Sequence, residues 1–450
     1  MRNRTLVAMS VGVLVAIAVP GRAETPVERR LRVLEEQLRA AQDEIQRLRG
    51  QVEQQRAIGQ ATQKQVEQTA EETKVATAEA KKSTELPDWL KRTAVFGDIR
   101  FRHEGFYHQP ARDETRVTAR NRERIRARIG VKATLSDELA ATVRLASGNP
   151  DDPISTNQTL GETFTPKNIN LDWAFITLTP GKTFGIRPGL LAVNAGKFPN
   201  PIFRASEMVF DDDLSPEGFS ETVALLGAPR GALQQVKVHA FQWTFDEVNN
   251  AEDGWIFGGQ VNPTFRVGPA TIDVGASHHW YLNEDAIARA TATNRDLKST
   301  NLLRRSDDTI LGYVNAFSVT NAGINATFAN AIGTMPVSLF ADFAHNWEAE
   351  EDDDGYLGGV KLGQTKVQGD WAIGAFYEHL EQEAANSVFT ASDFGLGGTN
   401  NEGPVVSVEY QLLNPLTLTA RNYFVNFIDR PAGTSNPTLF RLQLDALVRF

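Results

Sequence analysis

The last eleven residues of the chain, FRLQLDALVRF at positions 440–450, alternate between apolar and polar side chains. The apolar set is Phe440, Leu442, Leu444, Ala446, Val448 and Phe450, and the polar set is Arg441, Gln443, Asp445 and Arg449, with Leu447 as the exception. Successive side chains of a β-strand point to opposite faces, so this period of two predicts a strand with one apolar face. The same alternation recurs at 255–267 and at 270–282.

Working back from this terminal strand, short links alternate with long ones from about residue 93 onward. The short links are 136–138, 180–185, 227–231, 268–269, 331–336, 367–370 and 414–415. The long links are 105–118, 148–168, 198–220, 246–253, 283–308, 348–355, 383–403 and 429–437. Eight long links imply sixteen strands, with residues 309–330 as one long strand because their even positions keep one face.

Strictly alternating turns and long loops are typical of an outer-membrane β-barrel. The sequence therefore predicts an all-β transmembrane fold, a closed 16-stranded antiparallel barrel over residues 87–450. Closure is required because an open sheet edge in hydrocarbon leaves backbone groups without partners. A soluble β-sandwich or propeller is the alternative, but a soluble protein would not need sixteen such strands without a blade repeat, which the sequence lacks.

Composition agrees with this fold class. Only the first twenty residues contain a long apolar run, so a helical membrane protein is excluded. The chain has no cysteine, which excludes thiol catalysis, thiolate metal sites and a lipid anchor on Cys. A net charge of −10 argues against nucleic acid as a partner.

The N-terminus predicts an export signal followed by a coiled coil. Residues 1–23 contain basic Arg2 and Arg4, an apolar stretch and a small-x-small cleavage site at 21–23. Residues 24–86 are predicted to form an α-helical coiled coil and tether in the periplasm, ended by Pro87. Its heptad seam is Val27, Leu31, Leu34, Leu38, Ala41, Ile45, Leu48 and Val52. A short seam favours self-association, although a single helix packed on the barrel is the alternative.

Arginines occupy the polar face of the first three predicted barrel strands, where they alternate with apolar residues. The predicted basic pore-lining residues are Arg100, Arg102, Arg122, Arg124, Arg126, Arg128, Lys132 and Arg144. If this parity faces the lumen, the arginines form a positive stripe that attracts anions. The alternative is a stripe that acidic side chains neutralise completely, and the sequence leaves both open.

The third long link supplies the opposite charge. Its acidic residues Asp211, Asp212, Asp213 and Glu217 are predicted to face the arginines at a constriction, producing a transverse field. A solvated surface loop is the alternative. The three aspartates lack the spacing of an EF-hand, so no metal site and no cofactor are predicted.

Enzyme motifs are missing from the sequence. It contains no HExxH, no GxSxG and no P-loop. His278 and His279 are adjacent and would point to opposite faces of a strand. The sequence therefore nominates no catalytic residue.

Two loop segments resemble the putative porin family of Gram-negative bacteria. They are GNPDDPISTNQTLG at 148–161 and the segment from 196 to 218, which begins Gly-Lys-Phe and ends DDDLSPEG. The resemblance covers about residues 86–450 and implies a trimeric, 16-stranded porin with an N-terminal coiled coil. Phe450 resembles the C-terminal aromatic signal that the barrel-assembly machinery reads. The coil and the arginine stripe are also similar to phosphate-selective porins, but the lysine-rich loop of those channels is missing.

Together these features predict passive diffusion of small hydrophilic solutes and ions through a water-filled barrel that leans toward anions. The expected partners are outer-membrane lipids, lipopolysaccharide, the diffusing solutes, the assembly machinery and two further copies of the chain. The competing hypothesis is a structural tether whose plugged barrel serves only as an anchor.

Overall fold

The computed structural model describes individual residues between 27 and 74, and then residues 91–110, 117–250, 252–430 and 437–450. The chain divides into two units, Met1–Pro87 and Asp88–Phe450. The predicted signal peptide lies outside the described residues, as do Leu31, Leu34 and Ile45 of the predicted seam.

The described residues between 27 and 74 are helical. The five described seam residues, Val27, Leu38, Ala41, Leu48 and Val52, are exposed in the single chain. None of the described helices has the length and apolarity needed to cross a membrane. The coiled coil itself stays a prediction.

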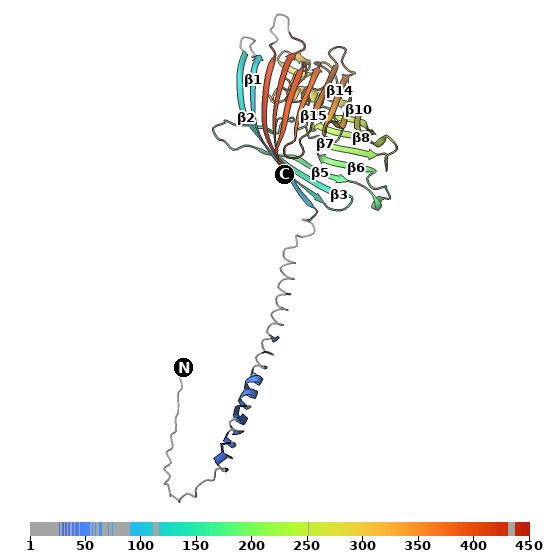
Figure 1. The fold of residues 1–450 in the computed structure, drawn as a ribbon. Coiled ribbons are helices and arrows are strands. Elements are labelled where there is room, and N and C mark those ends of the chain that lie inside the picture. The colour runs from blue at the N-terminus through green and yellow to red at the C-terminus, as the bar shows by residue number, and fades with distance from the viewer. Residues whose placement is uncertain are drawn as a thin grey trace. The chain divides into compact units, whose positions relative to one another are not determined.

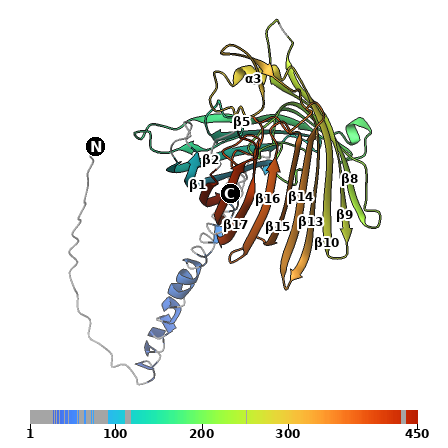
Figure 2. The same ribbon diagram turned by 90° about the horizontal axis from the view of Figure 1, so that it is seen from above.

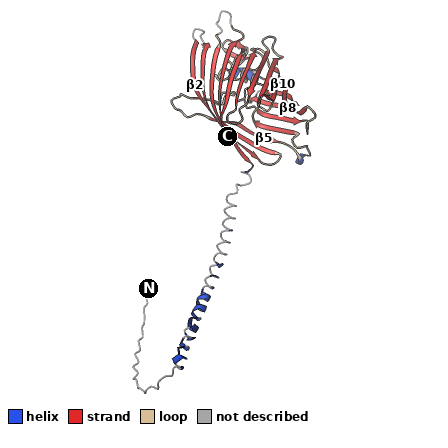
Figure 3. Cartoon of the chain, in the orientation of Figure 1, coloured by secondary structure: helices blue, strands red, loops and turns tan. Residues whose placement is uncertain are grey.

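Nearly all the regular secondary structure of the second unit is β-strand (Figure 3). They are β1 (Thr93–Pro110), β2 (Val117–Thr134), β3 (Leu139–Ser147), β4 (Gln158–Thr159), β5 (Ile169–Leu178), β6 (Leu191–Lys197), β7 (Glu217–Ala224), β8 (Leu233–Asp246), β9 (Gly254–Val267), β10 (Ala270–Leu282), β11 (Leu303–Ser306), β12 (Thr309–Tyr313), β13 (Ser318–Ile332), β14 (Met335–Asn346), β15 (Asp354–Gly363), β16 (Trp371–Leu380), β17 (Asn401–Leu413), β18 (Leu416–Phe427) and β19 (Leu439–Arg449). Two short helices, η1 (Lys182–Phe184) and α3 (Asp285–Ala290), lie in connections.

Sixteen of these described strands form one closed antiparallel barrel. Each pairs with its neighbours along the barrel, and β1 pairs with both β2 and β19, so the sheet has no open edge. The ribbon views show β13 to β17 running side by side in chain order (Figures 1 and 2). The two-residue β4 pairs with Arg124 and Ile125 in the middle of β2, and β11 pairs only with β12. The predicted barrel with sixteen strands is confirmed.

The prediction of one long strand over 309–330 is wrong. Residues Thr309–Tyr313 form β12, which pairs with β11 inside the long loop, and the barrel strand β13 begins only at Ser318. The segment is held there because Tyr313 N donates to Asp285 Oδ1 at 2.8 Å. The barrel still has sixteen strands, because β11 and β12 form a separate two-stranded sheet.

Alternation along the strands separates two environments. The outward parity carries exposed apolar side chains, for example Ile129, Val131 and Trp280, which are 51%, 42% and 42% exposed. The neighbouring inward positions include Arg126 and His279, which are buried. Exposed apolar residues around a closed barrel are what a lipid environment requires.

Three long loops supply most of a packed core inside the barrel, and Ile154 of the 148–168 loop joins it. They are loop 3 (198–216), loop 5 (283–317) and loop 7 (381–400). Their apolar side chains form a core with inward residues of the wall, and this core includes Met208, Phe210, Phe317, Phe389 and Trp243. Phe210 contacts the wall edge-on at Trp243, with ring centroids 5.7 Å apart. The loops therefore fill part of the lumen with a packed core.

Candidate functional site

The predicted basic residues of β1 to β3 share the inward parity of the barrel. We call the arginines among them the arginine face: Arg100, Arg102, Arg122, Arg124, Arg126, Arg128 and Arg144. The alternate positions on the same strands, such as Ile99, Phe101 and Ile129, are exposed on the outside. Lys132 has the same parity as Arg128 but lies exposed near the short-turn end of β2.

Loop 3 contacts the arginine face through a single carboxylate. Asp213 Oδ1 lies 3.1 Å from Arg128 Nη1 and 3.8 Å from Arg126 Nη1. Asp98 of β1 accepts from the Nε atoms of both arginines, at 2.9 and 2.7 Å. Burial alone would raise the pKa of Asp213, but Arg126 and Arg128 outweigh it and hold that pKa below its usual value. Asp213 therefore fastens loop 3 to the wall as an anion.

The other acidic residues of this segment point elsewhere. Asp212 pairs with Arg204 within loop 3 at 2.7 Å. Asp211 accepts from the backbone N–H of Ser392 in loop 7 at 2.7 Å, and burial with nearby Asp213 raises its pKa to about 8. A carboxyl group with that pKa is mostly neutral at pH 7, so Asp211 links the two loops without adding a full charge.

Glu217 does not belong to the constriction, which corrects its predicted placement. It opens β7 with the outward parity of exposed Phe219 and pairs with Lys197 at 2.8 Å. The reason is positional, because the loop ends at residue 216 and the strand's alternation then turns Glu217 away from the lumen.

A second ion-pair cluster joins β1, β19 and loop 7. Arg102, which is 2% exposed, donates from Nε to Asp445 Oδ1 at 2.7 Å and pairs with Asp393 at 2.9 Å. Arg441 bridges Asp393 at 2.7 Å and Glu104 at 2.5 Å. Burial opposes ionisation of Asp393, but Arg102 and Arg441 lower its pKa well below the usual value. These charges hold loop 7 against the wall as loop 3 is held at Asp213.

Arg100 and Arg124 are the least neutralised members of the arginine face. Among the described residues, their nearest carboxylates are Asp445 at 4.0 Å and Glu104 at 3.9 Å. Arg100 donates instead to Asn157 Oδ1 at 2.7 Å, and the Nε atoms of both arginines are buried without a hydrogen-bond partner. These two arginines thus make the longest ion pairs of the arginine face.

Arg144 makes structural contacts with β5. Its guanidinium pairs with Asp172 at 2.5 Å and lies 3.2 Å from the ring centre of Trp173. Asp172 also accepts from Ser215 Oγ, and Trp173 Nε1 donates to that same hydroxyl at 3.0 Å. The group anchors the end of loop 3 to β5.

Sequence reasoning missed the acids that neutralise the arginines and the contribution of loop 7. Asp98 and Glu104 stand at even positions of β1, with the same parity as Arg100 and Arg102, so alternation alone could have placed them in the lumen. Asp393 has no such signal because it lies in a loop. Only its packing inside the barrel brings it to Arg102.

Two cavities lie along the arginine face. The upper cavity, of about 620 Å³, lies toward the long loops and is lined by Arg122, Arg124 and Asp152 among others. The lower cavity, of about 270 Å³, is lined by Arg100, Arg102 and Arg126 together with acids of loops 3 and 7. Asn157 and Ser392 line both cavities, so these two residues mark the boundary between them.

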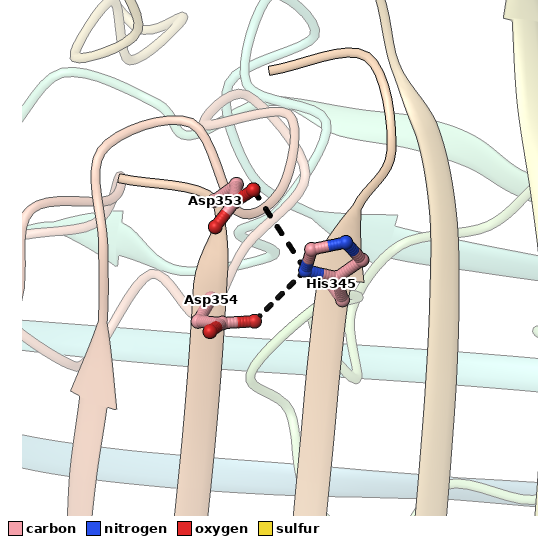
Figure 4. Close-up of side chains that lie close together, drawn as sticks. All are labelled: His345, Asp353 and Asp354. Atoms are coloured by element: carbon pink, nitrogen blue, oxygen red, sulfur yellow. Dashed lines mark hydrogen bonds and ion pairs between the residues drawn. The ribbon is translucent and has the colours of Figure 1, made fainter. Parts of the chain in front are cut away.

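One group of described residues could converge on a metal ion. Figure 4 shows that His345 Nδ1 faces Asp354 and Asp353, at 2.9 and 3.9 Å. His345 shares the outward parity of exposed Phe343 and Trp347, so the group lies on the outside of the barrel. It is separate from the arginine face, and its side chains already partner one another.

The C-terminal residue lies at the short-turn end of the barrel. Phe450 exchanges backbone hydrogen bonds with Gly97, at 2.9 and 3.1 Å, and its ring is 57% exposed. A Cβ on Gly97 would lie 2.8 Å from that ring, so glycine permits this close approach.

Comparisons with known proteins agree with this architecture. A family model described as putative porin matches residues 107–308 and 310–450. The high-pH structure of OprB from Pseudomonas putida is similar, with a TM-score of 0.50 and 14% identity over 80% of this chain and 94% of that chain. This likeness shows the fold alone.

Two further solved structures resemble the chain more distantly. OmpF of Salmonella typhi in complex with daunomycin has a TM-score of 0.46 and 9% identity, over 80% of this chain and 97% of that one. The outer membrane channel DcaP of Acinetobacter baumannii has a TM-score of 0.43 and 9% identity, with the same coverage. Among curated proteins, no sequence similar to this chain was found.

Proposed function

Because the chain belongs to the putative porin family, we propose that it lets small hydrophilic solutes and ions diffuse passively across the outer membrane. The proposed path runs from the upper cavity to the lower cavity past Asn157 and Ser392, which line both. The chain then acts as a channel and not as an enzyme. The long loops face the exterior in this proposal, and the short turns face the periplasm.

The observation that carries a leaning toward anions is the pair Arg100 and Arg124. They lie in the lower and the upper cavity respectively, on either side of the boundary between them, and neither has a close carboxylate partner among the described residues. A solute passing Asn157 meets both guanidinium groups, which attract anions and repel cations. Asp213 of loop 3 and Asp393 of loop 7 pair with Arg126, Arg128 and Arg102 on the same face, so Arg100 and Arg124 are the arginines proposed to attract anions.

The assembly state is part of the proposal. The exposed seam residues Val27, Leu38, Leu48 and Val52 favour a coiled coil between copies of the chain, and we propose a homotrimer. Phe450, with its exposed ring at the end of β19, is proposed as the signal for the assembly machinery. Outer-membrane lipids and lipopolysaccharide would surround the apolar outer face.

A structural anchor is the second candidate, and one observation favours it. Loops 3, 5 and 7 place an apolar core inside the lumen, with Met208 and Phe317 at most 1% exposed. Such packing is what a plugged barrel needs. The polar cavities along the arginine face favour the channel instead.

The first experiment records the purified protein in a planar bilayer under a KCl gradient. Stepwise, long-lived currents in groups of three would support a trimeric porin, and the sign of the reversal potential reports the preferred ion. Correctly folded, heat-modifiable protein that carries no current would refute the channel and leave the anchor.

A further inference from the structure

A third cavity opens beside the lower cavity and has a different chemical character. This side chamber, of about 470 Å³, lies between loop 3 and the inner faces of β14 to β18. It shares Glu207, Asp212, Asp393, Glu409 and Arg421 with the lower cavity. A solute in the proposed path therefore has direct access to it.

Strand register arranges the chamber wall in three levels. The pairings place Asp342, Leu357 and Glu378 side by side, then Phe340, Gly359, Phe376, Val405 and Tyr423, and then Lys361, Gly374, Ser407 and Arg421. Each level is two residues from the next along its strand. The wall thus changes from acidic through aromatic to basic.

The acidic level contains an unpartnered carboxylate. Glu378 lines the chamber at 3% exposure, and no hydrogen-bond or ion-pair partner lies within reach of it among the described residues. Asp342 beside it is satisfied, because it accepts from Ser206 Oγ at 2.5 Å and from Asn321 Nδ2 at 2.7 Å. Glu207 of loop 3 adds a second carboxylate without such a partner in the described structure. A buried carboxylate normally has a partner, so this end is suited to a cation from outside.

The aromatic level offers an apolar surface. Phe340 and Phe376 meet edge to face, with ring centroids 6.4 Å apart. Gly359 between them has no side chain, and a Cβ there would lie 2.4 Å from the Phe340 ring. The glycine therefore lets the two rings come together across β15.

The basic level closes the chamber with the Arg421 guanidinium. Arg421 donates to Tyr423 Oη at 3.3 Å, but it has no carboxylate in ion-pair range among the described residues. Lys361 is already paired with Glu409 at 2.8 Å. A carboxylate entering at this level would pair with Arg421.

We propose that the side chamber binds short zwitterionic peptides, or solutes of the same chemistry with an amine and a carboxylate at the two ends of an apolar body. The amine would lie at Glu378, the apolar body against Phe340 and Phe376, and the carboxylate at Arg421. The acidic and basic levels are four residues apart, about 13 Å along a strand. The side chains span part of that distance, which leaves roughly the length of an extended di- or tripeptide.

This inference rests on the proposed channel, since the chamber is reached through it. Its probe is the tripeptide Gly-Phe-Gly, added to the bilayer chamber while single-channel current is recorded. Three matched probes each test one level of the chamber. The N-acetyl form lacks the cation, the C-terminal amide lacks the anion, and Gly-Gly-Gly lacks the ring. We expect concentration-dependent blocking by Gly-Phe-Gly, with at least tenfold weaker blocking by each matched probe.

The variant Glu378→Gln tests whether the peptide amine binds at Glu378. In this variant we expect Gly-Phe-Gly to block at least tenfold more weakly, and acetylation to add no further loss, because the two changes remove the same interaction. Glu350→Gln is the control, since Glu350 lies exposed in the loop before β15. Equal blocking by the free and acetylated peptides, or unchanged blocking in Glu378→Gln, would overturn the proposal.

Calorimetric titration of Gly-Phe-Gly into the detergent-solubilised protein measures the same binding without current. Binding that depends on Glu378 in a protein that does not conduct would refute the porin and support the chamber. Conduction without binding would refute the chamber and leave the porin.

Discussion

Replacing Arg124 by glutamine removes one positive charge from the proposed path while keeping a polar side chain of similar length. Arg124 is suited to this test because its nearest carboxylate among the described residues, on Glu104, is 3.9 Å away. Its removal therefore leaves no tightly bound acid without a partner. The same change at Arg102 would remove the closest partner of Asp445 and one of the two arginine partners of Asp393, and would mix selectivity with folding.

The expected magnitude follows from Coulomb's law. An anion about 4 Å from a guanidinium gains about 1 kcal/mol in bulk water, and more where the surroundings are less polar. That energy corresponds to about a fivefold change in occupancy at room temperature. Salt at about 0.1 M screens charges beyond about 10 Å, so the effect at 4 Å survives in the assay. We expect Arg124→Gln to lower the chloride-to-potassium permeability ratio about fivefold.

The assay is the reversal potential in a planar bilayer under a KCl gradient, compared between the natural chain and the variant. Arg230→Gln is the control, because Arg230 lies exposed in the short turn before β8 and lines neither cavity. A heat-modifiable band confirms that each variant is folded. If Arg124→Gln conducts and keeps the original reversal potential, Arg124 does not face the permeating ions and the reasoning fails.

Three further results are expected. Asp213→Asn removes a negative charge beside the path and should raise the chloride-to-potassium ratio about twofold, from about 0.5 kcal/mol at about 8 Å in water; a fall in the ratio would contradict this. Burial raises the pKa of Asp152 to about 6, so the carboxylate loses its charge as the pH falls from 7.5 to 5.5. Anion preference should then rise with a midpoint near that pKa, and a response that persists in Asp152→Asn would assign it to another group. Phe317→Ala empties a site that is 1% exposed in the loop core, at about 3–5 kcal/mol. It should lower the temperature of the gel-mobility shift and raise the conductance, whereas Phe164→Ala, at a fully exposed position, should change neither.

The parity of each strand could be predicted from the sequence, because the two faces of a strand follow from local backbone geometry. Trp280 lies on the exposed apolar face and His279 is buried on the inward face, as the alternation at 270–282 requires. The same argument failed at 309–313, where five residues keep a strand-like pattern but pair with β11 in a loop. Periodicity shows that a segment is extended and does not show which strand it joins.

The candidate site depended on contacts between distant parts of the chain. Arg102 meets Asp393 across 291 residues, and Arg441 meets Glu104 across 337. Three aspartates and one glutamate of one segment were predicted to act together, yet only Asp213 reaches the arginine face. Which of these acids acts is decided by the path of the loop, and the sequence pattern does not report that path.

The sequence by itself thus determined the barrel, its two faces and the arginines on the inner one, since each follows from neighbours within a few residues. The tertiary structure alone decided which arginines have a close carboxylate partner and where the side chamber lies. Those properties depend on which loops fold into the lumen, and burial and ion pairing act through distance in space and not through distance along the chain.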